Sequence, residues 1–166
     1  MNNHLDATLI ETVPVNNTLG EGVLWGDLTH SIWWIDIEGC RFYQYDLKTK
    51  VLSSYPAPER IGCFGFVENE SYFIVAFASG LAYFWPASGQ IKWLAKLALP
   101  ALSRFNDGRV DRQGRFWPGT MMEAESSAEP LATLYQYTSD GSLLNRVDSL
   151  RVANGLCWSP DGTTMY

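Results

Sequence analysis

The sequence predicts an all-β fold made of repeated hairpins, and three observations lead to this prediction. Short runs of aromatic and β-branched residues alternate with Gly, Pro, Asn, Asp and Ser along the whole chain, as expected of strands and turns. The apolar spacing that marks an amphipathic helix is almost absent. One unit, an apolar segment followed by a polar turn and a second apolar segment, recurs along the sequence.

The spacing of this unit indicates a β-propeller. If Trp25, Val67, Val110 and Trp158 are equivalent, the steps between units are 42, 43 and 48 residues, and the longest step contains the polar loop 123–130. Periods of about 40–45 residues are typical of propeller blades. A β-sandwich would also give alternating strands. It has no reason, however, to repeat one unit at this spacing, whereas the units of a repeat protein pack on their neighbours.

The first blade is predicted over 20–58. Its first hairpin reverses at 29–31 and leads into the apolar run 32–35. A second hairpin follows, with strands at 41–46 and 51–52 and a turn at 48–50. Two hairpins give four strands, which is the number in a propeller blade.

The next two blades are predicted over 59–99 and 100–150, with the same two-hairpin plan. Their second hairpins turn at Ser88-Gly89 and at Asp140-Gly141, residue pairs that favour tight reversals.

A further blade is predicted to start at 151–166, where the sequence again shows an apolar segment, a polar turn and an apolar segment. We also expect an isolated strand at Ala7 to Val13. The chain is thus expected to be one partial propeller domain over 1–166, with about three blades and the start of a fourth. Such an open arc would expose apolar blade faces, and we expect it to self-associate.

Composition and charge exclude several classes of function. The 166 residues are 46% hydrophobic and carry a net charge of −6, without a Lys/Arg cluster for a nucleic acid to bind. No apolar run approaches the roughly 20 residues that span a bilayer, and the N-terminal residues lack the pattern of a secretory signal. We therefore expect a cytoplasmic protein with neither a nucleic acid nor a membrane as partner.

Polar residues recur just before the first strand of each repeat. Glu21, Asn106 and Asn154 occupy the same phase of the repeat, and in a propeller these segments converge at one end of the central channel. Carboxylate and amide oxygens are hard ligands that suit Ca²⁺, Mg²⁺ or Mn²⁺. The alternative is that Asn106-Asp107-Gly108 and Asn154-Gly155 are only turn sequences. Their shared phase with Glu21 favours a metal site.

Four motifs carry a resemblance to a known family. They are Gly20-Glu21-Gly22-x-x-Trp25, Arg104-Phe105-Asn106-Asp107-Gly108-Arg109-Val110-Asp111, Gly119-Thr120-Met121 and Asn154-Gly155-Leu156-x-Trp158-Ser159. In order and spacing, from Glu21 to Tyr166, they resemble the successive motifs of the SMP-30/gluconolactonase/regucalcin family. The resemblance implies a six-bladed propeller that binds one divalent cation and hydrolyses sugar lactones. Ca²⁺ is the favoured ion, with Zn²⁺, Mn²⁺ and Mg²⁺ as alternatives.

The resemblance also implies roles for particular residues. Glu21 and Asn154 resemble metal ligands, whereas Arg104 and Asn106 resemble residues that bind the substrate. The family has a further substrate-binding acid after Gly-Thr-Met; counting from Gly119 puts Ala124 at that place, with Glu123 or Glu125 as substitutes. The aspartate that is the family's metal ligand and usual catalytic base is expected beyond Tyr166, so the catalytic residue is not assigned.

The chemistry of such a site can be argued physically. A bound cation stabilises the oxyanion that forms when a lactone is hydrolysed, and Arg104 can hold two substrate oxygens in a fixed geometry. We expect a sugar lactone as the small-molecule partner and an aldonic acid as the product, with the 166-residue chain alone inactive. The alternatives are a non-catalytic, calcium-binding or regulatory propeller and a related metal-dependent esterase.

Overall fold

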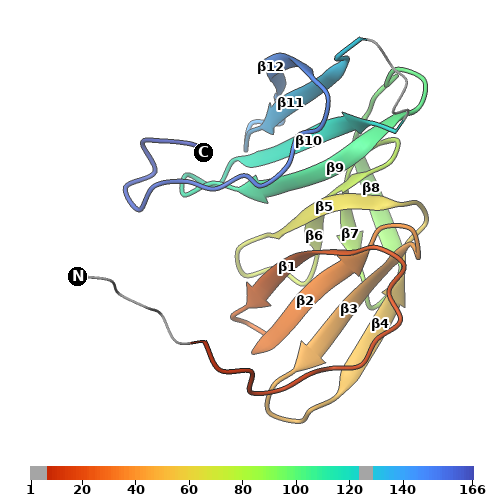
Figure 1. Ribbon diagram of the computed structural model, residues 1–166, viewed down its shortest axis with the longest axis vertical. Coiled ribbons are helices and arrows are strands. Elements are labelled where there is room, and N and C mark those ends of the chain that lie inside the picture. Colours follow the sequence, from red (N-terminus) through yellow and green to blue (C-terminus); the bar gives the residue numbers. More distant parts are fainter. Residues whose placement is uncertain (1–6, 124–128) are drawn as a thin grey trace.

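The computed structural model describes residues 7–123 and 129–166, and every regular element within these ranges is a β-strand. The strands form three four-stranded antiparallel sheets, shown one above another in Figure 1. The first sheet contains β1 (Gly20–Gly26), β2 (Ser31–Asp36), β3 (Arg41–Asp46) and β4 (Leu52–Pro56). The second contains β5 (Ile61–Phe66), β6 (Phe73–Phe77), β7 (Gly80–Trp85) and β8 (Gln90–Lys96). The third contains β9 (Ser103–Val110), β10 (Phe116–Met122), β11 (Ala132–Tyr137) and β12 (Leu143–Leu150).

Each sheet is a simple meander, because every strand pairs with its neighbours in the sequence. The turns explain this topology. In the turn between β3 and β4, the Asp46 carboxylate accepts hydrogen bonds from the backbone N–H groups of Lys48 (2.8 Å) and Thr49 (2.7 Å). Lys50 then adopts a φ of 60°, and the chain reverses within a few residues.

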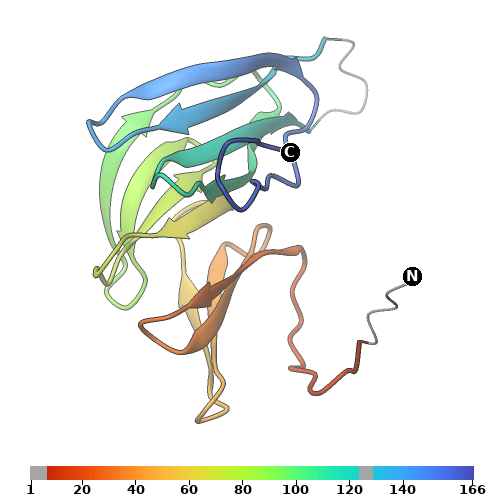
Figure 2. The ribbon, with the colours of Figure 1, turned by 90° about the vertical axis from the view of Figure 1, so that its left-hand side faces the viewer.

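The three sheets are arranged as blades of an open arc. β5 packs along β9, and β1 contacts β5, so the first strands of the sheets are neighbours. In Figure 2 the last strands, β4, β8 and β12, lie on the outer side of the arc. The arc does not close into a ring (Figure 1). The predicted all-β, partial propeller fold is therefore confirmed, while the exact blade boundaries stay a prediction.

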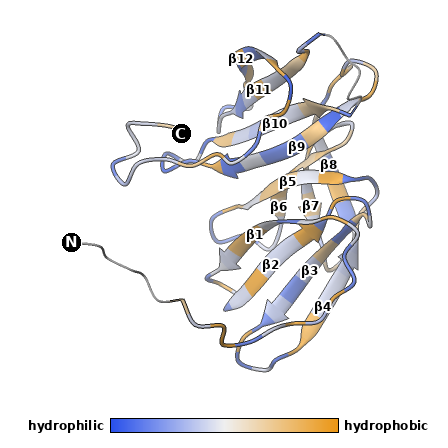
Figure 3. Cartoon of the chain, in the orientation of Figure 1, coloured by the Kyte–Doolittle hydropathy of each residue, from blue (hydrophilic) through white to orange (hydrophobic). Residues whose placement is uncertain are grey.

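Two apolar clusters hold the blades together. The first lies between the first and second sheets and is centred on Phe42, whose ring contacts Phe64, Phe73 and Phe84 at centroid distances of 5.4–5.6 Å. The second joins the second and third sheets and includes Phe105 and other buried residues. Figure 3 shows that hydrophobic and hydrophilic residues alternate along most strands. This period of two lets each sheet turn apolar side chains toward a neighbouring sheet.

One sequence-based expectation at the ends of the chain differs from the structure, and one agrees with it. Residues 7–13 form no strand, and this segment is attached to the first sheet by Glu11, which accepts hydrogen bonds from Tyr45 Oη and Lys50 Nζ, both at 2.6 Å. Residues 7–13 pair with no described backbone, so side-chain bonds alone attach this segment. The predicted hairpin of the fourth repeat does form: Cys157 and Tyr166 exchange two backbone hydrogen bonds, and the N–H of Ser159 donates to the carbonyl oxygen of Thr164 at 2.9 Å.

The close contact between β5 and β9 leads to a stability prediction. A Cβ atom added at Gly62 would lie 2.5 Å from the backbone carbon of Phe105, a distance that backbone atoms cannot relieve without moving. We expect Gly62→Ala to lower the free energy of unfolding by about 2–3 kcal/mol, measured by urea denaturation. Gly89→Ala is the control, because a Cβ there meets nothing within 4 Å and only its φ of 71° is unfavourable. Equal losses in the two variants would contradict the prediction.

Candidate functional site

The candidate site begins where the chain enters β1. The buried Asp36 carboxylate accepts hydrogen bonds from the backbone N–H groups of Thr18 and Leu19, both at 2.9 Å, which fixes the residues just before the strand. A bulge follows between Glu21 and Leu24, with Gly22 at a φ of 65°. The Glu21 side chain is exposed, and none of the described residues hydrogen-bonds to it. Its carboxylate is therefore available to a ligand.

Arg104 is the central side chain of the third sheet's part of the site. It is only 6% exposed, although it carries a full charge. Its Nη1 donates to the carbonyl oxygen of Phe105 (3.0 Å) and to Oδ1 of Asn106 (3.1 Å), and its Nε donates to Oε1 of Glu123 (3.3 Å). Within residues 7–123 and 129–166, no acceptor faces Nη2. This nitrogen is the part of the guanidinium that can bind a ligand.

Figure 3 shows hydrophilic residues on both sides of an apolar position in β9. This pattern corresponds to Arg104, the buried Phe105, and then Asn106 and Asp107. Phe105 anchors the strand in the second apolar cluster. Because neighbouring residues of a strand point to opposite faces, burial of Phe105 helps to place the polar side chains on either side of it.

Asn106 and Asp107 connect β9 to the segment after β12. Asn106 Nδ2 donates to the carbonyl oxygen of Ala153 (3.1 Å), and Oδ2 of Asp107 accepts from the backbone N–H of Gly155 (2.6 Å). These two bonds hold the backbone on both sides of Asn154. The Asn154 side chain is exposed and has no hydrogen bond to a described residue, so its amide oxygen is also available.

Glu123 follows β10 and forms an ion-pair network that crosses from the third sheet to the second. Its carboxylate accepts two hydrogen bonds from Arg60, from Nη1 at 2.5 Å and from Nη2 at 3.1 Å, in addition to the bond from Arg104. Arg60 also lies 3.4 Å from a carboxylate oxygen of Glu38. Glu123 thus fixes the position of Arg104 relative to the second sheet.

The charges around Glu123 change its titration. The hydrogen bond from Arg60 is the largest cause that lowers the pKa of Glu123, and the charges of Arg60 and Arg104 act in the same direction, while burial opposes them. The carboxyl group therefore stays ionised below its usual range, near pH 4.3.

This lowered pKa predicts a pH-dependent stability. The folded-state pKa lies below the unfolded one, so the stabilisation is present above about pH 4.3 and is lost as the pH falls through the folded-state pKa. We expect Glu123→Gln to lower the free energy of unfolding by about 1 kcal/mol at pH 7. The difference from the wild type should disappear in acid. Denaturation curves from pH 7 to pH 2.5 measure it.

Glu68→Gln is the matched control for this titration, because Glu68 is exposed and no described residue pairs with it. If the difference in the free energy of unfolding between the wild type and Glu123→Gln stayed constant down to pH 2.5, the ionised Glu123 carboxylate would not be the source of the stabilisation.

The structure brings some of the predicted site residues together and leaves others apart. Arg104, Asn106 and Glu123 form one hydrogen-bonded group, and Asn154 lies beside it on the same side of β9. The Glu21 side chain forms no hydrogen bond or ion pair with any of these residues. It belongs to the first sheet, at the corresponding end of its innermost strand.

The structure also bears on the choice of the acid after Gly-Thr-Met. Glu123 is the acid that contacts Arg104, whereas Ala124 and Glu125 lie outside the described residues. Two further residues belong to the site. Asp107 lies in a predicted motif, although no role was assigned to it from the sequence. Arg60 comes from another repeat, and only the packing of the sheets brings it to Glu123.

The donor atoms suit a divalent cation. Glu21 offers a carboxylate and Asn154 an amide oxygen, both exposed and without partners among the described residues, and hard cations prefer such oxygen ligands. Asn106 Oδ1 is held by Arg104, and a carbonyl oxygen has a second lone pair to share. Among residues 7–123 and 129–166, no group of three or more His, Cys, Asp or Glu side chains is close enough to hold a metal.

The sequence of the chain is similar to those of known proteins. Residues 19–166 match the profile of the SMP-30/Gluconolactonase/LRE-like region. The chain is 32% identical over 161 residues to the L-arabinolactonase of Azospirillum brasilense, covering 96% of this chain and 53% of that protein. It is 35% identical over 174 residues to the 6-deoxy-6-sulfogluconolactonase of Pseudomonas putida, covering 98% and 55%. The chain therefore spans about half the length of the curated relatives it matches.

A solved structure shows the same architecture. The crystal structure of a calcium-binding protein, regucalcin, from Agrobacterium tumefaciens superposes with a TM-score of 0.82 and 26% identity, covering 92% of this chain and 50% of that one. No helix of the described residues is long and apolar enough to cross a membrane.

Proposed function

Because the chain belongs to the SMP-30/gluconolactonase/LRE-like family, we propose that it binds a sugar lactone for hydrolysis to the aldonic acid, with the help of a divalent cation. The single observation that carries this proposal is Arg104. A buried guanidinium is costly unless its charge and donors are used, and no described residue accepts a hydrogen bond from Nη2. A neutral, hydroxyl-rich ring offers the acceptors that this nitrogen requires.

The named relatives support a lactone as the substrate. Two similar proteins are an L-arabinolactonase and a 6-deoxy-6-sulfogluconolactonase, which share a cyclic ester of a sugar acid. We propose a substrate of the same class for this chain.

The roles of the side chains follow from their contacts. Arg104 Nη2 would donate to ring or hydroxyl oxygens of the lactone, while Glu123 and Asn106 hold the guanidinium in place. Glu21 and Asn154 would hold the cation, Ca²⁺ in the first instance. When bound, the cation supplies a Lewis acid that stabilises the negative charge developing on the lactone carbonyl oxygen. Asp107 keeps Asn154 close to Arg104 through Gly155.

Binding and turnover together test this function. The purified protein is mixed with D-glucono-1,5-lactone and L-arabinono-1,4-lactone, with Ca²⁺, Zn²⁺, Mn²⁺ or Mg²⁺ or with a chelator. Ligand-detected NMR follows binding, and acid release follows hydrolysis. We expect cation-dependent binding of at least one lactone. Binding is the primary readout, because it reports on Arg104 and the cation ligands without requiring turnover. Failure to bind any sugar lactone with any of the cations would overturn the proposal.

A second function, a regulatory propeller that binds calcium and catalyses nothing, is favoured by one finding. The similar Agrobacterium tumefaciens structure is described as a calcium-binding protein, regucalcin. This function predicts that Ca²⁺ binds, whereas Arg104→Ala and Asn106→Ala leave every ligand affinity unchanged. A loss of lactone affinity in both variants would favour the hydrolase.

A further inference from the structure

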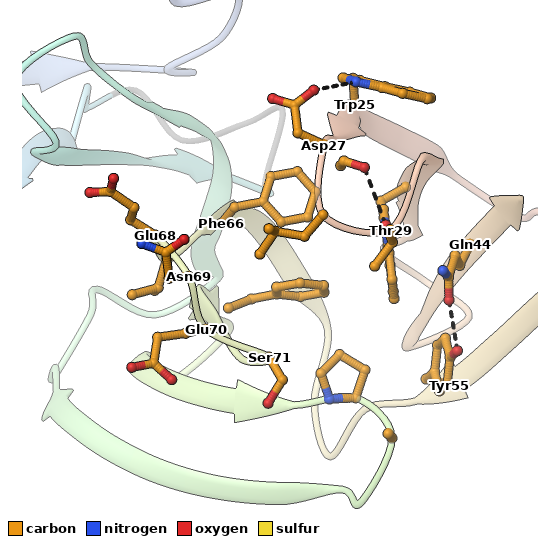
Figure 4. A pocket seen from close by; sticks show the side chains of 17 residues that line it. Trp25, Asp27, Thr29, Gln44, Tyr55, Phe66, Glu68, Asn69, Glu70 and Ser71 are labelled. Carbon is orange, nitrogen blue, oxygen red and sulfur yellow. Dashed lines mark hydrogen bonds between the residues drawn. The ribbon is translucent and has the colours of Figure 1, made fainter.

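A second cavity lies far from the candidate lactone site. It has a volume of about 450 Å³ and is bounded by the turns that follow β1 and β5, between the first and second sheets (Figure 4). Glu21 and Arg60 lie near the starts of these two inner strands, whereas Trp25 and Phe66 of the cavity lie at their ends. The cavity and the candidate lactone site therefore lie at opposite ends of the inner strands, on opposite faces of the propeller.

Aromatic rings form the walls of this cavity. Trp33 stacks on Tyr55 with centroids 5.6 Å apart and an interplanar angle of 18°, and it meets Phe73 edge to face at 4.9 Å. Phe66 and Pro86 add further apolar surface, and Figure 4 shows the Phe66 ring on the side opposite Tyr55. A volume of this size with aromatic walls is typical of small-molecule sites.

The polar atoms beside Trp33 and Tyr55 are already paired with one another. Trp33 Nε1 donates to Thr29 Oγ1 at 3.0 Å, and Tyr55 Oη donates to Gln44 Oε1 at 2.8 Å. Gln44 Nε2 in turn donates to Ser31 Oγ at 3.0 Å. The interior therefore presents ring faces instead of free donors. It suits an apolar or aromatic body and offers little to a sugar.

The opening of the cavity is acidic. Asp27, Glu68 and Glu70 line it, and its lining residues include no Lys, Arg or His. No described residue pairs with the carboxylates of Glu68 and Glu70, which lie together on one loop at the side of the opening in Figure 4. Asp27 accepts a hydrogen bond from Trp25 Nε1. An anion would be repelled here, and a cation would be attracted.

The rim of the cavity also carries exposed apolar side chains. Trp25 is 46% exposed and Leu28 is 69% exposed, and both border the opening. Exposed large apolar side chains beside a concave surface mark a binding site more often than a plain surface does. Ring faces near the acids would also attract an organic cation.

We propose that this cavity binds a small aromatic amine in its protonated form. The ring lies against the apolar wall that Phe66, Trp33 and Pro86 line, and the ammonium group lies at the opening near Glu68 and Glu70. This site is separate from the proposed lactone site, and its occupancy does not depend on lactone hydrolysis. The ligand differs in chemistry from both the sugar lactone and the aldonate product, which is an anion.

Three probes with one ring system and different charges test the proposal. These are 1-naphthylmethylamine, 1-naphthalenemethanol and 1-naphthoate, titrated into the 166-residue chain by ligand-detected NMR and calorimetry at low salt. We expect the amine to bind about fivefold more tightly than the alcohol and at least about tenfold more tightly than the carboxylate. The amine's advantage should fall in high salt. Equal or tighter binding of the carboxylate, or no binding of the amine, would overturn the proposal.

Two sets of variants locate the binding. Ser71 lines the cavity at an exposed position, so Ser71→Trp should fill the opening and weaken amine binding at least tenfold. Ser139→Trp, in an exposed turn of the third sheet, should leave it unchanged. The pair Glu68→Gln and Glu70→Gln should abolish the preference for the amine and keep the affinity for the alcohol. If the Ser71→Trp protein unfolded at the same temperature as the wild type and bound the amine with the same affinity, the amine would not bind in this cavity.

Discussion

Replacing Arg104 with lysine is expected to weaken binding of a sugar lactone by about 30-fold, which corresponds to about 2 kcal/mol for lost hydrogen bonds to a charged group. The guanidinium of Arg104 contacts Phe105, Asn106 and Glu123 and still has Nη2 free for a ligand. A lysine keeps the charge but places three donors on one atom, so it cannot hold these partners and the ligand together.

Calorimetry with 1,5-anhydro-D-glucitol measures this loss without turnover, because this compound has the ring and hydroxyls of a gluconolactone but no ester. Arg109→Lys is the matched control. Arg109 lies on the same strand and is exposed, and its side chain forms no hydrogen bond or ion pair with a described residue. Where hydrolysis is measurable, kcat/KM should fall in parallel. Similar affinities for the Arg104→Lys and wild-type proteins would show that Arg104 does not bind the substrate.

Replacing Phe42 with alanine is expected to lower the free energy of unfolding by about 3–5 kcal/mol. Phe42 is fully buried and contacts three rings of the second sheet, Phe64, Phe73 and Phe84. Its removal leaves a cavity between two blades that rigid neighbouring sheets cannot close.

Urea denaturation measures this effect against two controls. Phe42→Leu preserves much of the volume and should cost less than half as much. Leu47→Ala, in an exposed turn, should change stability by less than about 0.5 kcal/mol. A loss below about 1.5 kcal/mol for Phe42→Ala would contradict the view that this ring holds the two blades together.

Much of the fold could be predicted from the sequence, because the repeat is local. Each hairpin is specified by an apolar alternation and by turn residues such as Asp46, whose carboxylate binds the backbone of its own turn. The predicted strand at 7–13 does not form, because a strand is stabilised by its neighbours as well as by its own residues. Local pattern cannot supply those neighbours.

The aromatic residues illustrate the same limit. The sequence alone does not indicate which of the adjacent rings Trp33 and Trp34 fills the space between blades. Trp33 does, at 5% exposure, whereas Trp34 lies on the other face, stacks on Tyr43 and donates to Asn17. Successive residues of a strand point to opposite faces, so only one of an adjacent pair can enter a given interface.

The candidate site was predictable where one motif contains it. Arg104, Asn106 and Asp107 lie within four residues of one another, and their types alone indicate a polar site. The link from Glu123 to Arg60 joins residues 63 positions apart, and it depends on how the second and third sheets pack. No local pattern contains that information. The cavity bounded by the turns after β1 and β5 was missed for the same reason.

The central claim is that the polar end of β9 and the segment around Asn154 bind a sugar lactone. The most direct test is a backbone amide NMR titration of the protein with 1,5-anhydro-D-glucitol in the presence of Ca²⁺. We predict that the largest shifts fall at 104–108, at 153–155 and near Glu21, and that they shrink in the Arg104→Lys protein. Shifts confined to other regions, or none at saturating ligand, would contradict the account.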